Sequence, residues 1–172
     1  SGKAWRVLDV GTGSGAIAVA LASERKDIQV TATDLSPEAL AVAKENADRN
    51  GVKDRIAFLQ GDLFAAVTGP FDLIVSNPPY ISCSDFELLP PGIRNYEPAG
   101  ALLAGEDGTE VHRKLIDGGL AFLKSGGWLL MEMGEDQGAN LRTYLNEQGG
   151  YDTVGIRNDY GGAERVIKAR RK

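Results

Sequence analysis

The chain has 172 residues, a formal net charge of -5, 42% hydrophobic residues and 25% charged residues. These proportions are typical of one globular domain, and the acidic balance argues against a general affinity for the nucleic-acid backbone, which requires clustered Lys and Arg. A single cysteine and a single histidine exclude an internal disulfide framework and argue against a His/Cys metal site or a Cys-His nucleophile pair. No apolar run approaches the roughly 20 residues of a membrane span. Any catalysis is therefore expected from amides, carboxylates, backbone groups or a cofactor, with no metal.

Strand-like and helix-like segments alternate along the chain. Strands are predicted at residues 5–10, 28–34, 55–60, 71–76 and 127–133, and helices at 16–25, 37–50, 111–124 and 137–148. This alternation predicts a parallel sheet with right-handed crossovers. Two further strands, near 151–157 and 164–170, are joined by a short turn and indicate an antiparallel hairpin at one edge. We therefore expect a doubly wound α/β fold with a mostly parallel, seven-stranded sheet.

Domain organisation is expected to be simple. No internal repeat or low-complexity linker divides the sequence, so residues 1–172 are expected to form one domain. The first predicted strand begins almost at once, whereas a doubly wound domain usually has chain before that strand. We therefore expect a fragment that lacks N-terminal residues.

A glycine-rich turn follows the first strand and opens the first helix, in the order Asp9-Val10-Gly11-Thr12-Gly13-Ser14-Gly15. Glycines let the backbone turn sharply and approach a ligand closely, and ligands bind at the carboxyl ends of parallel strands. Asp34 ends the next strand about 20 residues later, where an acid accepts hydrogen bonds from ribose hydroxyls. The glycines alone would also fit a tight turn, but together with Asp34 they predict a site for a nucleoside-containing cofactor.

Two classes of cofactor fit this turn. Gly11, Gly13 and Ala16 match the dinucleotide pattern G-x-G-x-x-A, which keeps an NAD enzyme open. Gly15, however, falls where that pattern has no glycine, and a third acid, Asp62, follows the third strand. Asp62 would otherwise stabilise a turn after the strand.

The order of these acids and glycines resembles the Rossmann-like class of S-adenosylmethionine-dependent methyltransferases. That resemblance implies that the glycine turn carries the methionine moiety of S-adenosylmethionine and that Asp34 holds its ribose. It also implies that Asp62 binds the adenine amino group. The implied cofactor-binding residues are Gly11, Thr12, Gly13, Ser14, Gly15, Asp34, Leu35, Asp62, Leu63 and Asn77, with Leu35 and Leu63 beside the adenine ring.

Asn77-Pro78-Pro79-Tyr80 follows the fourth strand and is a stiff segment, because proline fixes its own φ and restricts the preceding residue. Asn-Pro pairs also begin ordinary turns. In methyltransferases that carry this motif, it implies methylation of a planar nitrogen: an adenine or cytosine amino group, or a glutamine amide. The Asn77 side-chain oxygen and the Pro78 carbonyl would accept the two N–H groups of that nitrogen. Tyr80 would pack beside the planar group.

More specifically, the chain resembles the bacterial HemK/PrmC family of release-factor glutamine methyltransferases. The matching segments are VLDVGTGSGAIAVALA, FDLIVSNPPYIS, NYEPAGALLAGEDG, GGWLLMEMGEDQG and NDYGGAERV. The resemblance implies methylation of the glutamine in the Gly-Gly-Gln loop of peptide-chain release factors, in the cytoplasm, by a monomer that binds neither membrane nor nucleic acid stably. Family members usually carry an N-terminal helical domain that helps to bind the release factor, and none is present here. The alternatives are an adenine amino methyltransferase acting on DNA or RNA, and a catalytically silent binding domain.

Residues 81–108 form a connection that is long for a compact domain, and such connections are often functional. We expect this segment to cover the substrate pocket, with Tyr96, Glu97 and Pro98 bracing the Asn77 motif. Residues 106–108 are expected to begin the helix that contains His112, with the histidine on a solvated surface.

Overall fold

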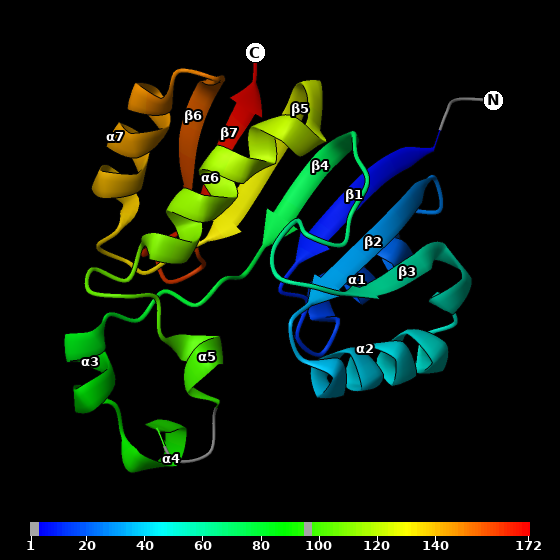
Figure 1. Cartoon of the computed structure of the whole chain (residues 1–172), viewed down its shortest axis with the longest axis horizontal. Helices are drawn as coiled ribbons and strands as arrows, with labels where there is room; N and C mark the ends of the chain where they lie inside the picture. Colours follow the sequence, from blue (N-terminus) through cyan, green and yellow to red (C-terminus); the bar gives the residue numbers. More distant parts are fainter. Residues whose placement is uncertain (1–3, 95–97) are drawn as a thin grey trace.

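The computed structural model of the protein describes residues 4–94 and 98–172, and a seven-stranded sheet forms its centre (Figure 1). The strands are β1 (Trp5–Val10), β2 (Ile28–Asp34), β3 (Ile56–Gln60), β4 (Phe71–Ser76), β5 (Leu123–Glu132), β6 (Tyr151–Asn158) and β7 (Glu164–Arg171). The principal helices are α1 (Ala16–Glu24), α2 (Pro37–Arg49), α6 (Glu110–Phe122) and α7 (Gly138–Gln148). The elements predicted from the sequence are confirmed, with boundaries that differ by a few residues.

The sheet has the strand order β3-β2-β1-β4-β5-β7-β6. The first five of these strands are parallel, whereas β7 pairs antiparallel with both β5 and β6. The predicted doubly wound sheet with an antiparallel edge hairpin is therefore confirmed. Because β7 runs against β5, its last residues lie at the same edge of the sheet as the start of β1, as Figure 1 shows.

The residues at the two ends of helix α2 show how local sequence determines where a helix begins and ends. The Ser36 hydroxyl accepts a hydrogen bond from the Ala39 N–H, and Pro37 occupies the first helical position. Both features favour a helix start at this point. The helix ends at Arg49, and Gly51 follows with a φ of 66°, a left-handed conformation that glycine adopts without strain.

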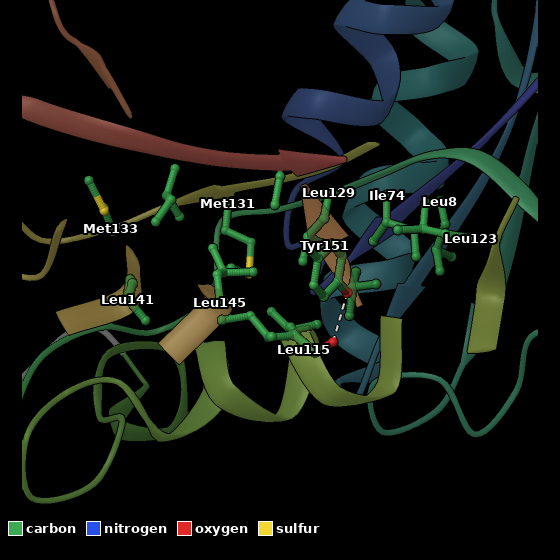
Figure 2. Packing of buried hydrophobic residues seen from close by; sticks show 14 of the residues in the cluster. Leu8, Ile74, Leu115, Leu123, Leu129, Met131, Met133, Leu141, Leu145 and Tyr151 are labelled. Carbon is green, nitrogen blue, oxygen red and sulfur yellow. Dashed lines mark hydrogen bonds between the residues drawn. The ribbon is translucent and has the colours of Figure 1, made fainter. Parts of the chain in front are cut away.

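Side chains alternate between the two faces of the sheet and so build two cores. Leu8 and Ile74 join the larger cluster under α6 and α7, whereas their neighbours Val7 and Val75 join the smaller cluster under α1 and α2. Figure 2 shows the larger cluster, in which the Tyr151 hydroxyl donates a 2.7 Å hydrogen bond to the carbonyl of Ile116. Both faces are thus covered, as a parallel sheet requires.

The connection from β4 to α6 is more regular than the sequence indicates. Its described residues include three short helices, α3 (Cys83–Leu88), α4 (Pro91–Arg94) and α5 (Ala99–Leu102), which lie beyond the carboxyl ends of the parallel strands in Figure 1. Tyr96 and Glu97, expected to brace the Asn77 motif, lie outside the described residues. None of the helices in the described ranges is both long and apolar enough to cross a membrane.

Two expectations about α6 are wrong. The helix begins at Glu110 with Thr109 as its N-cap, so residues 106–108 belong to the preceding turn. His112 is fully buried rather than solvated. Its Nε2 lies 2.7 Å from the carbonyl of Glu132 at the end of β5, and this backbone partner lets a polar ring occupy the interior.

Candidate active site

The carboxyl ends of four neighbouring strands meet at one edge of the sheet. Val10 of β1 pairs with Thr33 on one side and with Ser76 on the other. The Ser76 hydroxyl also donates a 2.7 Å hydrogen bond to the Val10 carbonyl, which fixes the two strand ends together. The glycine turn that follows β1 and the Asn77 motif that follows β4 therefore begin on adjacent strands, whose spacing is about 4.8 Å.

The glycine turn has one open side and one packed side. Gly11 and Gly13 have φ angles of 67° and 56°, and a Cβ atom at either position would meet nothing within 4 Å. Gly15 also has a positive φ, but there a Cβ would lie 3.0 Å from the Cβ of Ala43 on α2. Gly11 and Gly13 thus leave backbone accessible to a ligand, whereas Gly15 is required for the close packing of α2.

The remaining turn residues, Thr12 and Ser14, differ in orientation. Thr12 is buried, and its hydroxyl donates a 2.7 Å hydrogen bond to Asp9 beneath the turn. Ser14 is exposed, and its carbonyl accepts a hydrogen bond from the Asn46 side chain of α2. Thr12 therefore supports the turn from below, and its backbone N–H and carbonyl are already paired with Thr33 and Gly15.

Asp34 ties the ends of β1 and β2 together. One carboxylate oxygen accepts the Gly13 N–H at 2.8 Å, and the other accepts the Ser36 N–H at 2.9 Å. Each oxygen keeps further acceptor capacity, and the residue is only partly buried. The adjacent Leu35 is 69% exposed, so apolar surface lies beside the carboxylate. An acid next to an exposed leucine is an arrangement that can hold a ribose and an attached flat base.

Asp9 is a buried acid at this edge, and its pKa is raised. It is fully buried at the end of β1, where one oxygen accepts hydrogen bonds from Thr12 and from the Ala18 N–H. Its other oxygen, Oδ1, has no partner among the residues that the structure describes. Burial raises the pKa of Asp9 to about 6, against the lowering effect of those two hydrogen bonds. At neutral pH it therefore places a negative charge beneath the glycine turn.

Asp62 and Leu63 follow β3, beside the end of β2. The Gly61 N–H donates to the Asp34 carbonyl at 3.0 Å, which holds this turn against the site. Asp62 is exposed, and its carboxylate makes no hydrogen bond within the described part of the chain, so a turn-stabilising role of that side chain gains no support. Leu63 has a left-handed φ of 47° and packs partly against the larger core cluster.

The Asn77 motif projects from the end of β4. Asn77 is exposed, and its side-chain amide makes no hydrogen bond to the residues described. Pro78 is buried, whereas Pro79 and Tyr80 are half-buried. The Asn77 side-chain amide is thus free to bind a ligand, and the prolines that follow it are rigid and partly or fully buried. It lies at the end of β4, the strand next to the one that precedes the glycine turn. The arrangement suits the binding of a polar planar group near a cofactor.

The charges at this edge favour a cationic ligand. Asp9 and Asp34 lie at the carboxyl ends of β1 and β2, and Asp62 follows the adjacent β3, so a pyrophosphate over the glycine turn would be repelled and a positive charge attracted. Within residues 4–94 and 98–172, no group of three or more His, Cys, Asp or Glu side chains is arranged to hold a metal ion.

Sequence reasoning missed Gln137 and Gly108. Both contact the segment that leaves the Asn77 motif: the Gln137 side-chain amide donates to the Tyr80 carbonyl at 2.8 Å and to the Gly108 carbonyl at 3.1 Å. Gln137 lies in the GEDQG stretch and Gly108 in the EDG stretch, both of which were noted only as parts of a resemblance. The signal was present, but contacts between residues 57 positions apart cannot be read from spacing.

Comparisons with known proteins identify the family. The model of the methyltransferase small domain family matches residues 2–88. A release factor glutamine methyltransferase of Rhodopirellula baltica is 44% identical over 94% of this chain and 55% of its own length. One from Xylella fastidiosa is 50% identical over 84% of this chain and 52% of its own length. The chain therefore spans little more than half the length of these curated relatives.

Solved structures share the fold. A ribosomal protein L11 methylase from Lactobacillus delbrueckii subsp. bulgaricus has a TM-score of 0.70 and 27% identity, covering 99% of this chain and 72% of that one. The catalytic domain of hMettl16 has a TM-score of 0.76 at 19% identity, covering 96% and 64% of the two chains. The family model matches half of the chain, and together with the glycine turn and the strand-end acids it shows that the chain belongs to the methyltransferase small domain family.

Proposed function

We propose that the chain is the catalytic domain of a protein-glutamine methyltransferase, which transfers a methyl group from S-adenosylmethionine to the side-chain amide of a glutamine in a peptide-chain release factor. The observation that carries the proposal is the free, exposed amide of Asn77 on the strand next to the glycine turn. The curated relatives named above, at 44% and 50% identity, support the choice of substrate.

The residues at the strand ends fit S-adenosylmethionine, which is a cation at its sulfur. The open sides of Gly11 and Gly13 leave room for the methionine moiety, and the buried charge of Asp9 favours the positive charge above it. Asp34 has acceptor capacity for ribose hydroxyls. Leu35, Asp62 and Leu63 offer apolar surface and a free carboxylate for the adenine, while Gly15 acts through the packing of α2. When bound, this cofactor supplies a methyl group whose bond to sulfur breaks as the new bond to nitrogen forms.

The Asn77 motif supplies what an amide nitrogen needs in order to accept a methyl group. Its lone pair is delocalised into the carbonyl, and its two hydrogens require two acceptors. The Asn77 side-chain oxygen accepts one, and the Pro78 carbonyl accepts the other. Both hydrogen bonds strengthen as positive charge grows on the nitrogen, which is preorganised stabilisation of the transition state. The nitrogen then releases one of these protons to water, and a singly methylated amide remains. Pro79 and the ring of Tyr80 restrict the approach of the planar group.

The setting of this activity forms part of the proposal. A release factor acts in translation, so the reaction takes place in the cytoplasm. The net charge of -5 supports a protein substrate over a duplex, since a base methyltransferase must hold the nucleic acid around a flipped base. We expect the domain to act as a monomer without stable binding to nucleic acid.

The test uses methyl-labelled S-adenosylmethionine and three acceptors: an intact release factor, the same factor with the glutamine of its Gly-Gly-Gln loop replaced, and duplex DNA. Label on the intact factor alone is the expected result. Label on DNA, or equal label on both release factors, would contradict the proposal.

A variant pair separates the chemistry from the cofactor site. Asn77→Ala should abolish most of the transfer, whereas Asn140→Ala, at an exposed position on α7, should leave it unchanged. The cofactor should remain bound in both variants, because neither change touches the glycine turn.

A further inference from the structure

We infer that Gln137 is a positioning residue. It follows β5, on the side of β4 away from the glycine turn, and holds the Asn77 motif in its productive geometry. This inference rests on the proposed function, because the motif is where the substrate amide would bind. Gln137 itself lies on the turn between β5 and α7 and is not proposed to touch substrate or cofactor.

The Gln137 side chain joins three separate segments of the chain. Its Oε1 accepts the Gly134 N–H at 2.9 Å, after β5. Its Nε2 donates to the Tyr80 carbonyl at 2.8 Å, after β4, and to the Gly108 carbonyl at 3.1 Å, before α6. All three hydrogen bonds of this amide group are thus made to backbone atoms. One side chain therefore fixes the relative positions of the segments that follow β4, precede α6 and follow β5.

Gly108 makes this approach possible. Its φ is 72°, and a Cβ atom there would lie 2.5 Å from the Tyr80 carbonyl oxygen and 2.7 Å from the Nε2 of Gln137. A real Cβ does not approach atoms so closely. A side chain at position 108 would therefore separate Gln137 from Tyr80.

The backbone of Gln137 is itself fixed. Its backbone N–H donates to the Gly134 carbonyl at 3.1 Å, and its carbonyl accepts the Leu141 N–H at 3.0 Å, because it is the N-cap of α7. Gln137 can therefore act as a rigid support for Tyr80, since its own backbone is held by the turn and by the helix.

Fixing the Tyr80 carbonyl restricts the whole motif. On one side, Asn77 is held by the pairing of Ser76 with β1 and β5. Between them, Pro78 and Pro79 have fixed φ angles, and each residue that precedes a proline is confined to extended conformations. With both ends held, few backbone rotations remain that could turn the Pro78 carbonyl away from a substrate N–H.

The isosteric change Gln137→Glu tests this role. The carboxylate keeps one oxygen for the Gly134 N–H but directs the other at the carbonyls of Tyr80 and Gly108. When ionised, it repels both; when protonated, it can donate to one of them. Gln148→Glu is the matched control, because Gln148 ends the same helix and its Oε1 also accepts a backbone N–H, that of Gly150, at 3.0 Å.

Two readouts follow from these variants. Amide hydrogen exchange across residues 80–84, measured by mass spectrometry, should be faster in Gln137→Glu than in the wild type and unchanged in Gln148→Glu. With a release factor as acceptor, kcat at pH 8 should fall about 10–10²-fold, because a displacement of about 1 Å costs that much in rate. The KM for S-adenosylmethionine should not change. The loss in kcat should shrink as the pH falls and the introduced carboxyl takes up a proton.

Gln137→Met serves as a second variant if Gln137→Glu does not fold at pH 8, as judged by circular dichroism. It has similar length and no charge, so it should show the same faster exchange and lower kcat without recovery at low pH. Wild-type exchange and kcat in a folded Gln137 variant would overturn the inference. If the wild type methylates no release factor, the proposed function fails, and the exchange of residues 80–84 alone decides whether Gln137 holds the motif.

Discussion

The buried carboxyl of Asp9 should make the stability of the fold decrease as the pH rises. An acid whose pKa in the folded state lies above its unfolded value binds more protons when folded, so ionisation favours unfolding. The pKa of Asp9 is raised from an ordinary 3.8 to about 6. That difference corresponds to about 3 kcal/mol in the free energy of unfolding at full effect, at 1.36 kcal/mol per pKa unit. Between pH 4.5 and 7.5, the expected loss is about 2 kcal/mol.

The assay compares urea unfolding of the wild type and of Asp9→Asn at several pH values. Asparagine keeps an oxygen for Thr12 and Ala18 but places an amide group where Oδ1 has no partner, so the substitution itself has a cost. That cost does not depend on pH. The wild type should therefore lose about 2 kcal/mol relative to Asp9→Asn between pH 4.5 and 7.5. A difference that stays constant, or that grows in favour of the wild type, would refute the assigned pKa of Asp9.

Three other substitutions test separate parts of the molecule. Asn77→Ala should lower kcat about 10²–10³-fold, by analogy with the loss of an oxyanion donor, and leave the cofactor bound, because the glycine turn is untouched; loss of cofactor binding in a calorimetric titration would contradict this separation. Asp34→Ala should weaken S-adenosylhomocysteine binding roughly 10–10²-fold, because the carboxylate supports Gly13 and is proposed to accept hydrogen bonds from the ribose; an unchanged Kd would exclude that role. Burial lowers the pKa of His112, so its contribution reduces stability as the pH falls below about 6.5. His112→Gln should remove that contribution, and parallel pH profiles of wild type and variant in urea unfolding would count against it.

The sequence predicted the sheet because its signals are local. Ser36 and Pro37 mark the start of α2, and the runs before Gly11 and Asn77 are short, apolar and followed by turn residues. Each element therefore carries its own signal, and the alternation of strands and helices supplies the topology.

The burial of His112 could not be predicted, because the contact that permits it is not local in the sequence. A histidine near polar residues reads as a surface residue, and only the fold brings the Glu132 carbonyl within 2.7 Å of its ring. The same holds for Gln137, whose partners come from three separate connections. Residues 11–15 and Asn77 directly follow a strand and Asp34 ends one, so they could be found as candidate site residues, whereas the residues that hold them depend on tertiary contacts.

The insertion of β7 between β5 and β6 has a practical consequence for binding measurements. Because β7 runs antiparallel to β5, Arg171 ends at the edge of the sheet where β1 begins with Trp5, and a strand the length of β1 spans about 20 Å from there to the glycine turn. A tether to a sensor surface that is attached near Trp5 or Arg171 would therefore leave the glycine turn and Asn77 directed toward the solution. Association of a large protein partner should then be measurable without obstruction by the support.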